Sequence, residues 1–191
     1  MTVGETDEQL AERLASAAGA ILLDLQASGE FAGKALGQAG DTRANAMLMD
    51  ELRAARPGDA ILSEEEKDNV VRCDSRRAWI IDPLDGTREY SEERDDWAVH
   101  VALAVDGVPT VGAVALPGLG LTLTSGMPTP LKPANVPPKM LVSRTRPAAE
   151  ALHVAERMGA ELLAMRSAGA KARAVVRGEA DIYLHTRGQY E

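Results

Sequence analysis

Residues 79–87, WIIDPLDGT, decide the fold, because an apolar strand runs there directly into acidic turn residues. Proline lacks an amide hydrogen and keeps the preceding residue extended, so Pro83 is expected to end ladder pairing at Asp82. Asp85 follows three residues after Asp82, and a turn between them can aim both carboxylates at one point. The Leu84 carbonyl, left out of the ladder, adds a neutral oxygen. Carboxylate and carbonyl oxygens, with water, are the ligands that hard cations such as Mg²⁺ prefer.

The segments on either side add to this stretch. Gly86 allows the backbone to approach a ligand closely, and free N–H groups of Gly86 and Thr87 at a turn can bind a phosphate oxygen. Upstream, residues 63–66, SEEE, end a predicted strand and place Glu64 where it can add a carboxylate. Each piece alone has an ordinary interpretation as a turn or a solvated acidic face. Together, and in this order, they predict a site for divalent cations and phosphate.

The spacing of the two aspartates also separates two classes of phosphatase. Enzymes that form an aspartyl-phosphate carry two aspartates two residues apart after a strand. Here the aspartates are three residues apart with a proline between them. This spacing disfavours a covalent aspartyl intermediate.

Composition limits the partners of the chain. Its 191 residues suffice for one large or two small domains, and 45% are hydrophobic. A net charge of −8 and 3% aromatic residues disfavour binding to nucleic acid polymers or anionic membranes. A small phosphorylated substrate bridged by cations remains compatible with that charge. One cysteine and a polar N-terminus without an apolar signal core favour the cytoplasm.

Hydrophobic periodicity predicts two helices at the start of the chain. Residues 7–25 show an amphipathic pattern, with Thr6 and Gln9 as a capping box. A Gly-rich loop is expected from Gly29 to Gly40. Asp41 is then expected to cap the second helix.

From residue 60 onward the pattern changes to short strands. Asp106 and Gly107 form a tight hairpin signal between two β-branched segments. His100, inside one of these strands, is expected to have a structural role. Two helices followed by an antiparallel meander are therefore predicted for the first domain, residues 1–125.

A proline-rich linker is predicted at residues 126–138. The segment 125–138 holds five of the ten prolines of the chain. Residues 139–191 then alternate strands and helices, which predicts the start of a second domain with parallel strand pairs. The fold class is α/β, of the α+β kind.

The residues around 79–87 resemble the signature of the inositol monophosphatase superfamily, whose members are magnesium-dependent and lithium-sensitive phosphatases. The resemblance extends to residues 61–65, ILSEE, and 167–171, SAGAK, and covers nearly the whole chain in motif order. It implies the layered α-β-α-β-α fold of sugar phosphatases. The continuation DGTREY and residues 94–100, RDDWAVH, are similar to CysQ-type nucleotidases of actinobacteria, the branch that acts on 3′-phosphoadenosine 5′-phosphate.

By position, the resemblance implies a site for two or three Mg²⁺ ions. Glu64, Asp82 and the Leu84 carbonyl match the ligands of the first ion. Asp82 and Asp85 match part of the shell of the second ion.

The resemblance also implies catalytic and substrate-binding residues. Asp41 and Thr87 match the pair that orients and deprotonates the attacking water, with Glu64 as a further catalytic residue. The implied substrate contacts are Asp85, Gly86, Thr87, Ser167, Lys171 and His185.

The reaction so implied is hydrolysis of the 3′-phosphate of 3′-phosphoadenosine 5′-phosphate to AMP and phosphate, a step in sulfate assimilation. An inositol-1-phosphate or fructose-1,6-bisphosphate phosphatase is an alternative, because family members share the metal site. A non-catalytic metal-binding relative or inactive fragment is a second alternative. The sequence leaves the oligomeric state undecided, and a homodimer is one alternative.

The chain departs from the family pattern in two places. Many members carry Ser-Pro-Val-Thr before the catalytic aspartate, where this chain has residues 36–40, LGQAG. A Trp-Asp pair that ligates the second ion is expected after a segment like residues 188–191, GQYE. The sequence stops at Glu191, so the resemblance implies an incomplete second domain and weak binding of the second ion.

Overall fold

The computed structural model describes residues 4–67, 70–127, 130, 132–144, 146–165 and 168–184. The chain divides into two compact units, Met1–Pro128 and Thr129–Glu191. The predicted linker at 126–138 spans this division. Each unit is described by itself.

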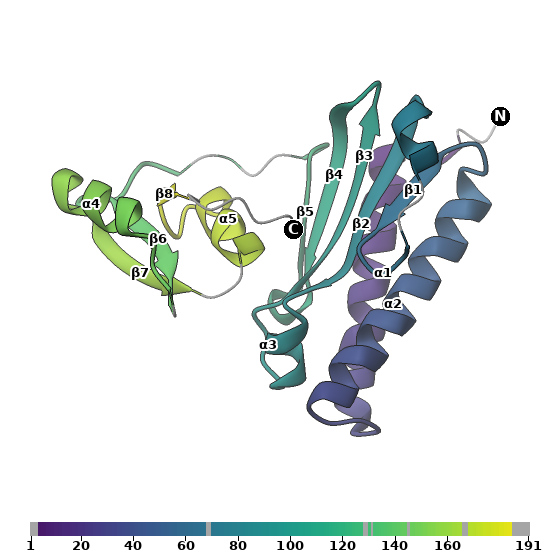
Figure 1. The fold of residues 1–191 in the computed structure, drawn as a ribbon, viewed down its shortest axis with the longest axis horizontal. Coiled ribbons are helices and arrows are strands. Elements are labelled where there is room, and N and C mark those ends of the chain that lie inside the picture. Colours follow the sequence, from purple (N-terminus) through teal and green to yellow (C-terminus); the bar gives the residue numbers. More distant parts are fainter. Residues whose placement is uncertain are drawn as a thin grey trace. The chain divides into compact units, whose positions relative to one another are not determined.

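Unit 1 is a two-helix layer on a five-stranded sheet with strand order β1-β2-β3-β4-β5 (Figure 1). Strand β1 pairs parallel with β2, and the other pairs are antiparallel. Two short 3₁₀ turns lie at Val70–Asp74 and Pro117–Leu119. Its helices and strands are α1 (Asp7–Ser28), α2 (Lys34–Ala55), β1 (Ala60–Ser63), β2 (Arg77–Asp85), α3 (Thr87–Ser91), β3 (Ala98–Val105), β4 (Val108–Leu116) and β5 (Leu121–Thr124).

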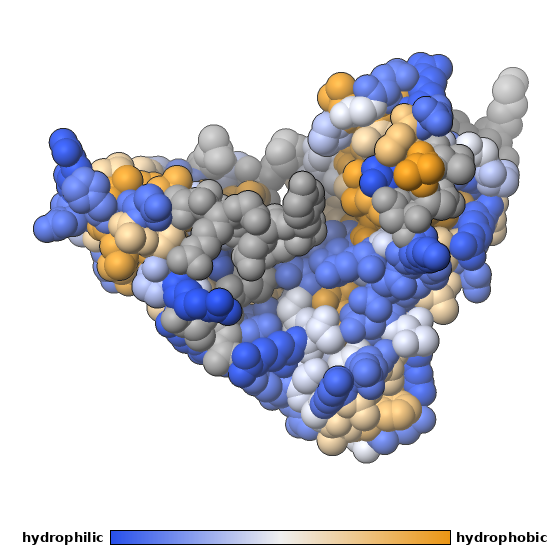
Figure 2. Space-filling view, viewed as in Figure 1, coloured by the Kyte–Doolittle hydropathy of each residue, from blue (hydrophilic) through white to orange (hydrophobic). Residues whose placement is uncertain are grey.

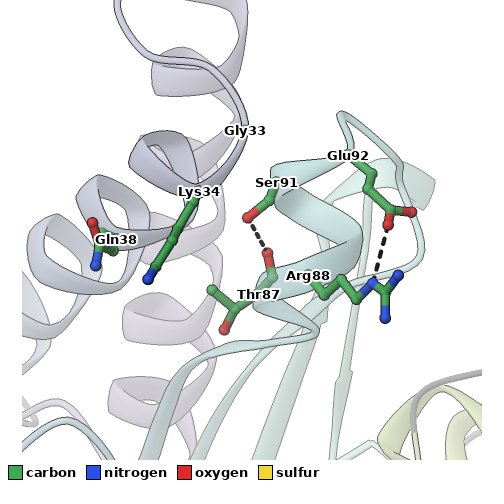
Figure 3. A pocket seen from close by; sticks show the side chains of 7 residues that line it. All are labelled: Gly33, Lys34, Gln38, Thr87, Arg88, Ser91 and Glu92. Atoms are coloured by element: carbon green, nitrogen blue, oxygen red, sulfur yellow. Dashed lines mark hydrogen bonds and ion pairs between the residues drawn. The ribbon is translucent and has the colours of Figure 1, made fainter.

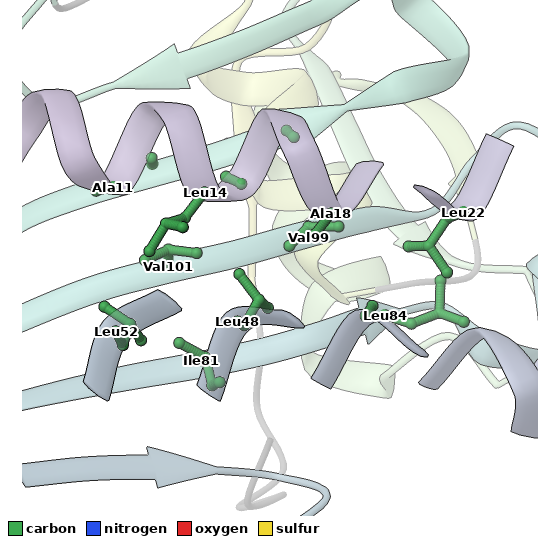
Figure 4. Close-up of a cluster of buried hydrophobic side chains, with 14 of the residues drawn as sticks. Ala11, Leu14, Ala18, Leu22, Leu48, Leu52, Ile81, Leu84, Val99 and Val101 are labelled. Carbon is green, nitrogen blue, oxygen red and sulfur yellow. The ribbon is translucent and has the colours of Figure 1, made fainter. Parts of the chain in front are cut away.

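The core of unit 1 lies between the two long helices and one face of the sheet (Figure 4). Helix α1 contributes Leu14 and Leu22, α2 contributes Leu48, and the strands contribute Ile81 and Val101, all buried. Burial of apolar side chains on one face of each element is the main favourable term in folding. Most exposed residues on the opposite side of α2 are hydrophilic (Figure 2).

Two local predictions for unit 1 are confirmed. The capping box of α1 is present, since Thr6 Oγ1 accepts from Gln9 N at 3.2 Å and Gln9 Oε1 accepts from Thr6 N at 3.0 Å. Asp106 and Gly107 have φ values of 52° and 77°, as the predicted tight hairpin requires.

The predicted start of the second helix is wrong. Helix α2 begins at Lys34, so residues 34–40 are helical rather than loop, and Asp41 lies inside the helix rather than at its cap. Gly37 and Gly40, which suggested a loop, have a packing role. A Cβ atom at Gly40 would lie 2.8 Å from Cε1 of Tyr90 and 3.2 Å from Cδ2 of Leu84, so tertiary contact outweighs helix propensity there.

Unit 2 has a three-stranded parallel sheet with order β7-β6-β8. Strands alternate with helices, as predicted. Its elements are β6 (Lys139–Ser143), α4 (Ala149–Met158), β7 (Glu161–Met165), α5 (Ala168–Val176) and β8 (Ile182–Tyr183). The Asp181 carboxylate accepts from the backbone amides of Asn135 at 2.9 Å and Lys139 at 2.7 Å, which joins the segment before β6 to the start of β8.

No helix in the part of the chain that the structure describes is both long and apolar enough to cross a bilayer.

Tyr90 joins α3 to α1, and its contribution to stability can be measured. The Tyr90 hydroxyl is buried and donates to the Leu22 carbonyl at 2.7 Å, while the ring packs edge-on against Trp97 at 5.1 Å. Tyr90→Phe keeps the ring contact and removes the hydrogen bond. We expect the free energy of unfolding in urea to fall by about 1 kcal/mol. An unchanged free energy would show that this bond does not stabilise the position of α3.

Candidate active site

The carboxyl end of β2 is irregular where the sequence places its acidic residues. Asp82 pairs with His100 and Asp85 pairs with Ala98, with a register shift between these two pairs. Pro83 cannot donate to the ladder, which accounts for the irregularity. The ladder resumes at Asp85, so the prediction that it ends at Asp82 is wrong. The Asp82 carboxylate accepts from the Leu84 amide at 3.0 Å.

Gly86 turns the chain from β2 into α3. Its φ of 95° is in the region that favours glycine, and a Cβ there would lie 3.2 Å from Cβ of Trp97. Thr87 begins α3, and its hydroxyl donates to the Leu84 carbonyl at 3.1 Å. The carbonyl that the sequence predicted to be free therefore has a hydrogen-bond partner. A carbonyl oxygen has a second lone pair for another ligand.

Asp41 and Thr87 are brought together from different elements. The Asp41 side chain projects from α2, is half-buried, and lies close to Thr87, whose side chain acts to lower the pKa of Asp41. Burial raises the pKa of Asp41 to about 7, and the nearby charges of Glu65 and Glu64 act in the same direction. A carboxyl group with a pKa in this range has the property that a general base needs at neutral pH.

The carboxyl groups at 64, 82 and 85 influence one another. Burial raises the pKa of Asp82 well above its usual range, and the charges of Asp85 and Glu64 raise it further, against an opposing effect of His100. Within the described residues, no three His, Cys, Asp or Glu side chains lie close enough together to hold an ion. The carboxyl groups therefore lie in one region, but they are farther apart than the ligands of a single ion.

His100 contacts the predicted metal ligands. Its Nε2 lies 3.2 Å from Oδ2 of Asp85, and the residue sits opposite Asp82 in the β2–β3 pairing. The sequence assigned His100 a structural role without identifying a partner. The sequence feature that indicated this contact was the place of His100 in the strand that pairs with β2.

Sequence reasoning missed Asn45, which is buried one helical turn after Asp41. Ser63 Oγ donates to Asn45 Oδ1 at 2.7 Å, and Asn45 Nδ2 donates to Glu66 at 3.0 Å. These bonds tie the turn that carries Glu64 to α2. An amide side chain on the same helix face as Asp41 was the only signal in the sequence.

A cavity of about 480 Å³ opens beside Thr87 (Figure 3). Helix α2 contributes Lys34 and Gln38, and Gly33 precedes it. Thr87, Arg88, Ser91 and Glu92 line the cavity from α3 and the residue after it. Of the predicted site residues, Thr87 lines this cavity, and Asp41 is not among its lining residues.

The three site residues predicted beyond residue 129 belong to unit 2. Lys171 is 4% exposed in α5, and its Nζ lies 5.1 Å from the centre of the Tyr183 ring. Ser167 and His185 lie outside the described residues.

The model of the inositol monophosphatase family matches residues 5–190. The chain is 47% identical to 3′-phosphoadenosine 5′-phosphate phosphatase of Mycobacterium leprae, over 97% of this chain and 74% of that protein. It is 28% identical to the 3′(2′),5′-bisphosphate nucleotidase CysQ of Escherichia coli, over 76% of this chain and 64% of that protein.

Solved structures show the same fold. The inositol monophosphatase II of Staphylococcus aureus superimposes with a TM-score of 0.76 at 20% identity, over 91% of this chain and 71% of that chain. CysQ from Bacteroides thetaiotaomicron superimposes with a TM-score of 0.75 at 22% identity, over 94% of this chain and 79% of that chain. The family match spans both units, and the chain belongs to the inositol monophosphatase family.

Proposed function

We propose that this protein removes the 3′-phosphate of 3′-phosphoadenosine 5′-phosphate, giving AMP and phosphate. The observation that carries the chemistry is the Asp41–Thr87 pair beside the crowded carboxyls of β2. The substrate follows from the names of the mycobacterial and enterobacterial relatives. We further propose that the reaction takes place in the cytoplasm and supports sulfate assimilation.

The donor atoms at the end of β2 fit Mg²⁺ in kind. Asp82 and Asp85 offer carboxylates, Leu84 offers a carbonyl, and Glu64 is exposed at the turn after β1, where its side chain has room to rotate inward. Crowded like charges raise the pKa of Asp82, and a cation would relieve that repulsion. When bound, two or three such ions would supply Lewis acidity to the phosphate and to a nearby water.

The residues of the chain would then carry out the proton and positioning steps. Asp41, which lies beside Thr87, accepts a proton from the attacking water. The water oxygen forms a bond to phosphorus as the bond from phosphorus to the 3′-oxygen breaks. The released 3′-oxygen takes a proton. The Gly86 and Thr87 amides would bind a phosphate oxygen. Ser167, Lys171 and His185 remain proposed substrate contacts from unit 2.

Asp41→Asn tests the proposed general base. Full-length enzyme with Mg²⁺ is given the bisphosphate nucleotide, inositol-1-phosphate and fructose-1,6-bisphosphate, and released phosphate is measured. We expect the nucleotide to be cleaved fastest, Li⁺ to inhibit, and Asp41→Asn to lower kcat by about 10²- to 10⁴-fold. The matched control is Asp50→Asn, which changes an exposed carboxylate on the same helix.

The outcomes separate the alternatives. Faster release from inositol-1-phosphate or fructose-1,6-bisphosphate would replace the proposed substrate. No release from any of the three by wild-type protein would favour a non-catalytic relative. Equal activity of Asp41→Asn and Asp50→Asn would remove Asp41 from the mechanism.

The raised carboxyl pKa values predict how stability depends on pH without divalent cations. Asp41 has a folded-state pKa of about 7 against an ordinary value of 3.8, so between these values the folded state holds a proton that the unfolded state has lost. Stability is therefore present at low pH and lost as pH rises through about 7. Mg²⁺ should restore it, and urea unfolding should show a larger Mg²⁺ effect at pH 8 than at pH 5.5.

Asp82→Asn removes one of the crowded charges. We expect this variant to be more stable than wild type by about 1–3 kcal/mol at pH 8 without Mg²⁺, and to lose most of the Mg²⁺ effect. Asp50→Asn should leave both quantities unchanged. A destabilised Asp82→Asn protein that still responds fully to Mg²⁺ would contradict the assignment of Asp82 as a ligand.

A further inference from the structure

Helix α2 packs tightly against α3 at Gly37. A Cβ atom at this position would lie 2.4 Å from Ser91 Oγ, 3.0 Å from Thr87 Cγ2 and 3.4 Å from the Thr87 carbonyl oxygen. Gly37 is helical, so the position requires glycine for space rather than for backbone conformation. A side chain there would displace the Ser91 hydroxyl and press on the Thr87 methyl group.

The contact involves the face of α3 that carries Thr87. Thr87 and Ser91 are four residues apart, so they lie on the same side of α3. Ser91 Oγ also donates to the Thr87 carbonyl at 2.7 Å. In Figure 3 both side chains lie on the side of α3 that faces α2. The atoms that a Cβ at Gly37 would displace are therefore those of Thr87 and of its hydrogen-bond partner.

Gly37 stands in the same relation to Asp41. The two residues are four apart in α2, so they share a helix face on successive turns. Asp41 lies near Thr87 across the same helix–helix contact, one turn further along α2. The separation that Gly37 permits is thus the separation across which the catalytic pair meets.

We infer that Gly37 is a positioning residue, which lets α3 pack close enough to α2 to keep Thr87 beside Asp41. This inference rests on the proposed function, because it assigns Gly37 an effect on the chemical step. It also explains a departure from the family pattern. The segment before the catalytic aspartate lacks Ser-Pro-Val-Thr in this chain, and the structure continues α2 through it on small residues instead.

Gly37→Ala tests the inference in the full-length enzyme. A displacement of Thr87 by a fraction of an ångström weakens the chemical step more than substrate binding. We therefore expect kcat to fall by about 10- to 100-fold with KM changed less than about threefold. Activity is divided by the folded fraction, measured from the thermal unfolding curve.

Gly19→Ala is the matched control for overpacking. A Cβ at Gly19 would lie 2.5 Å from Cγ of Pro117, a clash of the same size in the same unit that involves no predicted site residue. We expect this variant to lose melting temperature but to keep kcat per folded molecule. A merely structural role for Gly37 would make the two variants behave alike.

Ser91→Ala tests whether relief of the close contact restores folding and activity to Gly37→Ala. It removes the atom nearest to the new methyl group, so Gly37→Ala/Ser91→Ala should fold even where Gly37→Ala does not. The remaining close contact is Thr87 Cγ2 at 3.0 Å. We expect kcat of the double variant to lie within about tenfold of Ser91→Ala alone.

Three results would overturn the inference. Unchanged kcat per folded Gly37→Ala, or a loss matched by Gly19→Ala, would remove the positioning role while the phosphatase stands. Failure of Ser91→Ala to recover any activity in the Gly37→Ala background would show that the contact acts by another route. A wild-type enzyme that releases no phosphate would overturn the proposed function, and this inference with it.

Discussion

Repulsion among carboxyl groups at the end of β2 is the unfavourable interaction on which the proposed metal site depends. Burial disfavours the ionised form of Asp82, and the charges of Asp85 and Glu64 add to that cost. The fold nonetheless places Asp82 and Asp85 at one end of β2, with Glu64 exposed on the turn after β1. Pro83 interrupts the ladder beside Asp82, and β3 places His100 against Asp85. Such an arrangement is retained where function needs it, because it does not stabilise the fold.

The helices add the remaining groups to that centre. Asn45 joins α2 to the turn after β1 and so fixes the position of the backbone that carries Glu64. Gly37 and Gly40 let α3, Tyr90 and Leu84 approach α2 without a side chain between them. Two glycines weaken an isolated helix, but here they permit the contacts that place Thr87 beside Asp41. The two glycines thus lower the intrinsic stability of α2 and allow the packing that shapes the site.

Much of this was predictable from local sequence, and the rest depended on tertiary contact. Thr6 with Gln9 and Asp106 with Gly107 act through neighbouring atoms, and both were predicted correctly. The acidic residues at the end of β2 were identifiable because proline and glycine constrain the backbone directly. The start of α2 was missed because Gly37 and Gly40 suggested a loop, whereas both glycines serve close packing against other elements. The partner of His100 and the bonds of Asn45 could not be found, because they join residues far apart in the chain.

The proposed function requires that the oxygens of Asp82, Asp85, Glu64 and Leu84 form a single centre for divalent cations. Anomalous scattering from crystals of the full-length protein soaked in Mn²⁺ tests this requirement most directly. We expect anomalous peaks within about 2.0–2.3 Å of Asp82 and at least two of the other three groups. Peaks only at surface carboxylates elsewhere, in crystals of protein whose phosphatase activity requires the metal, would contradict it.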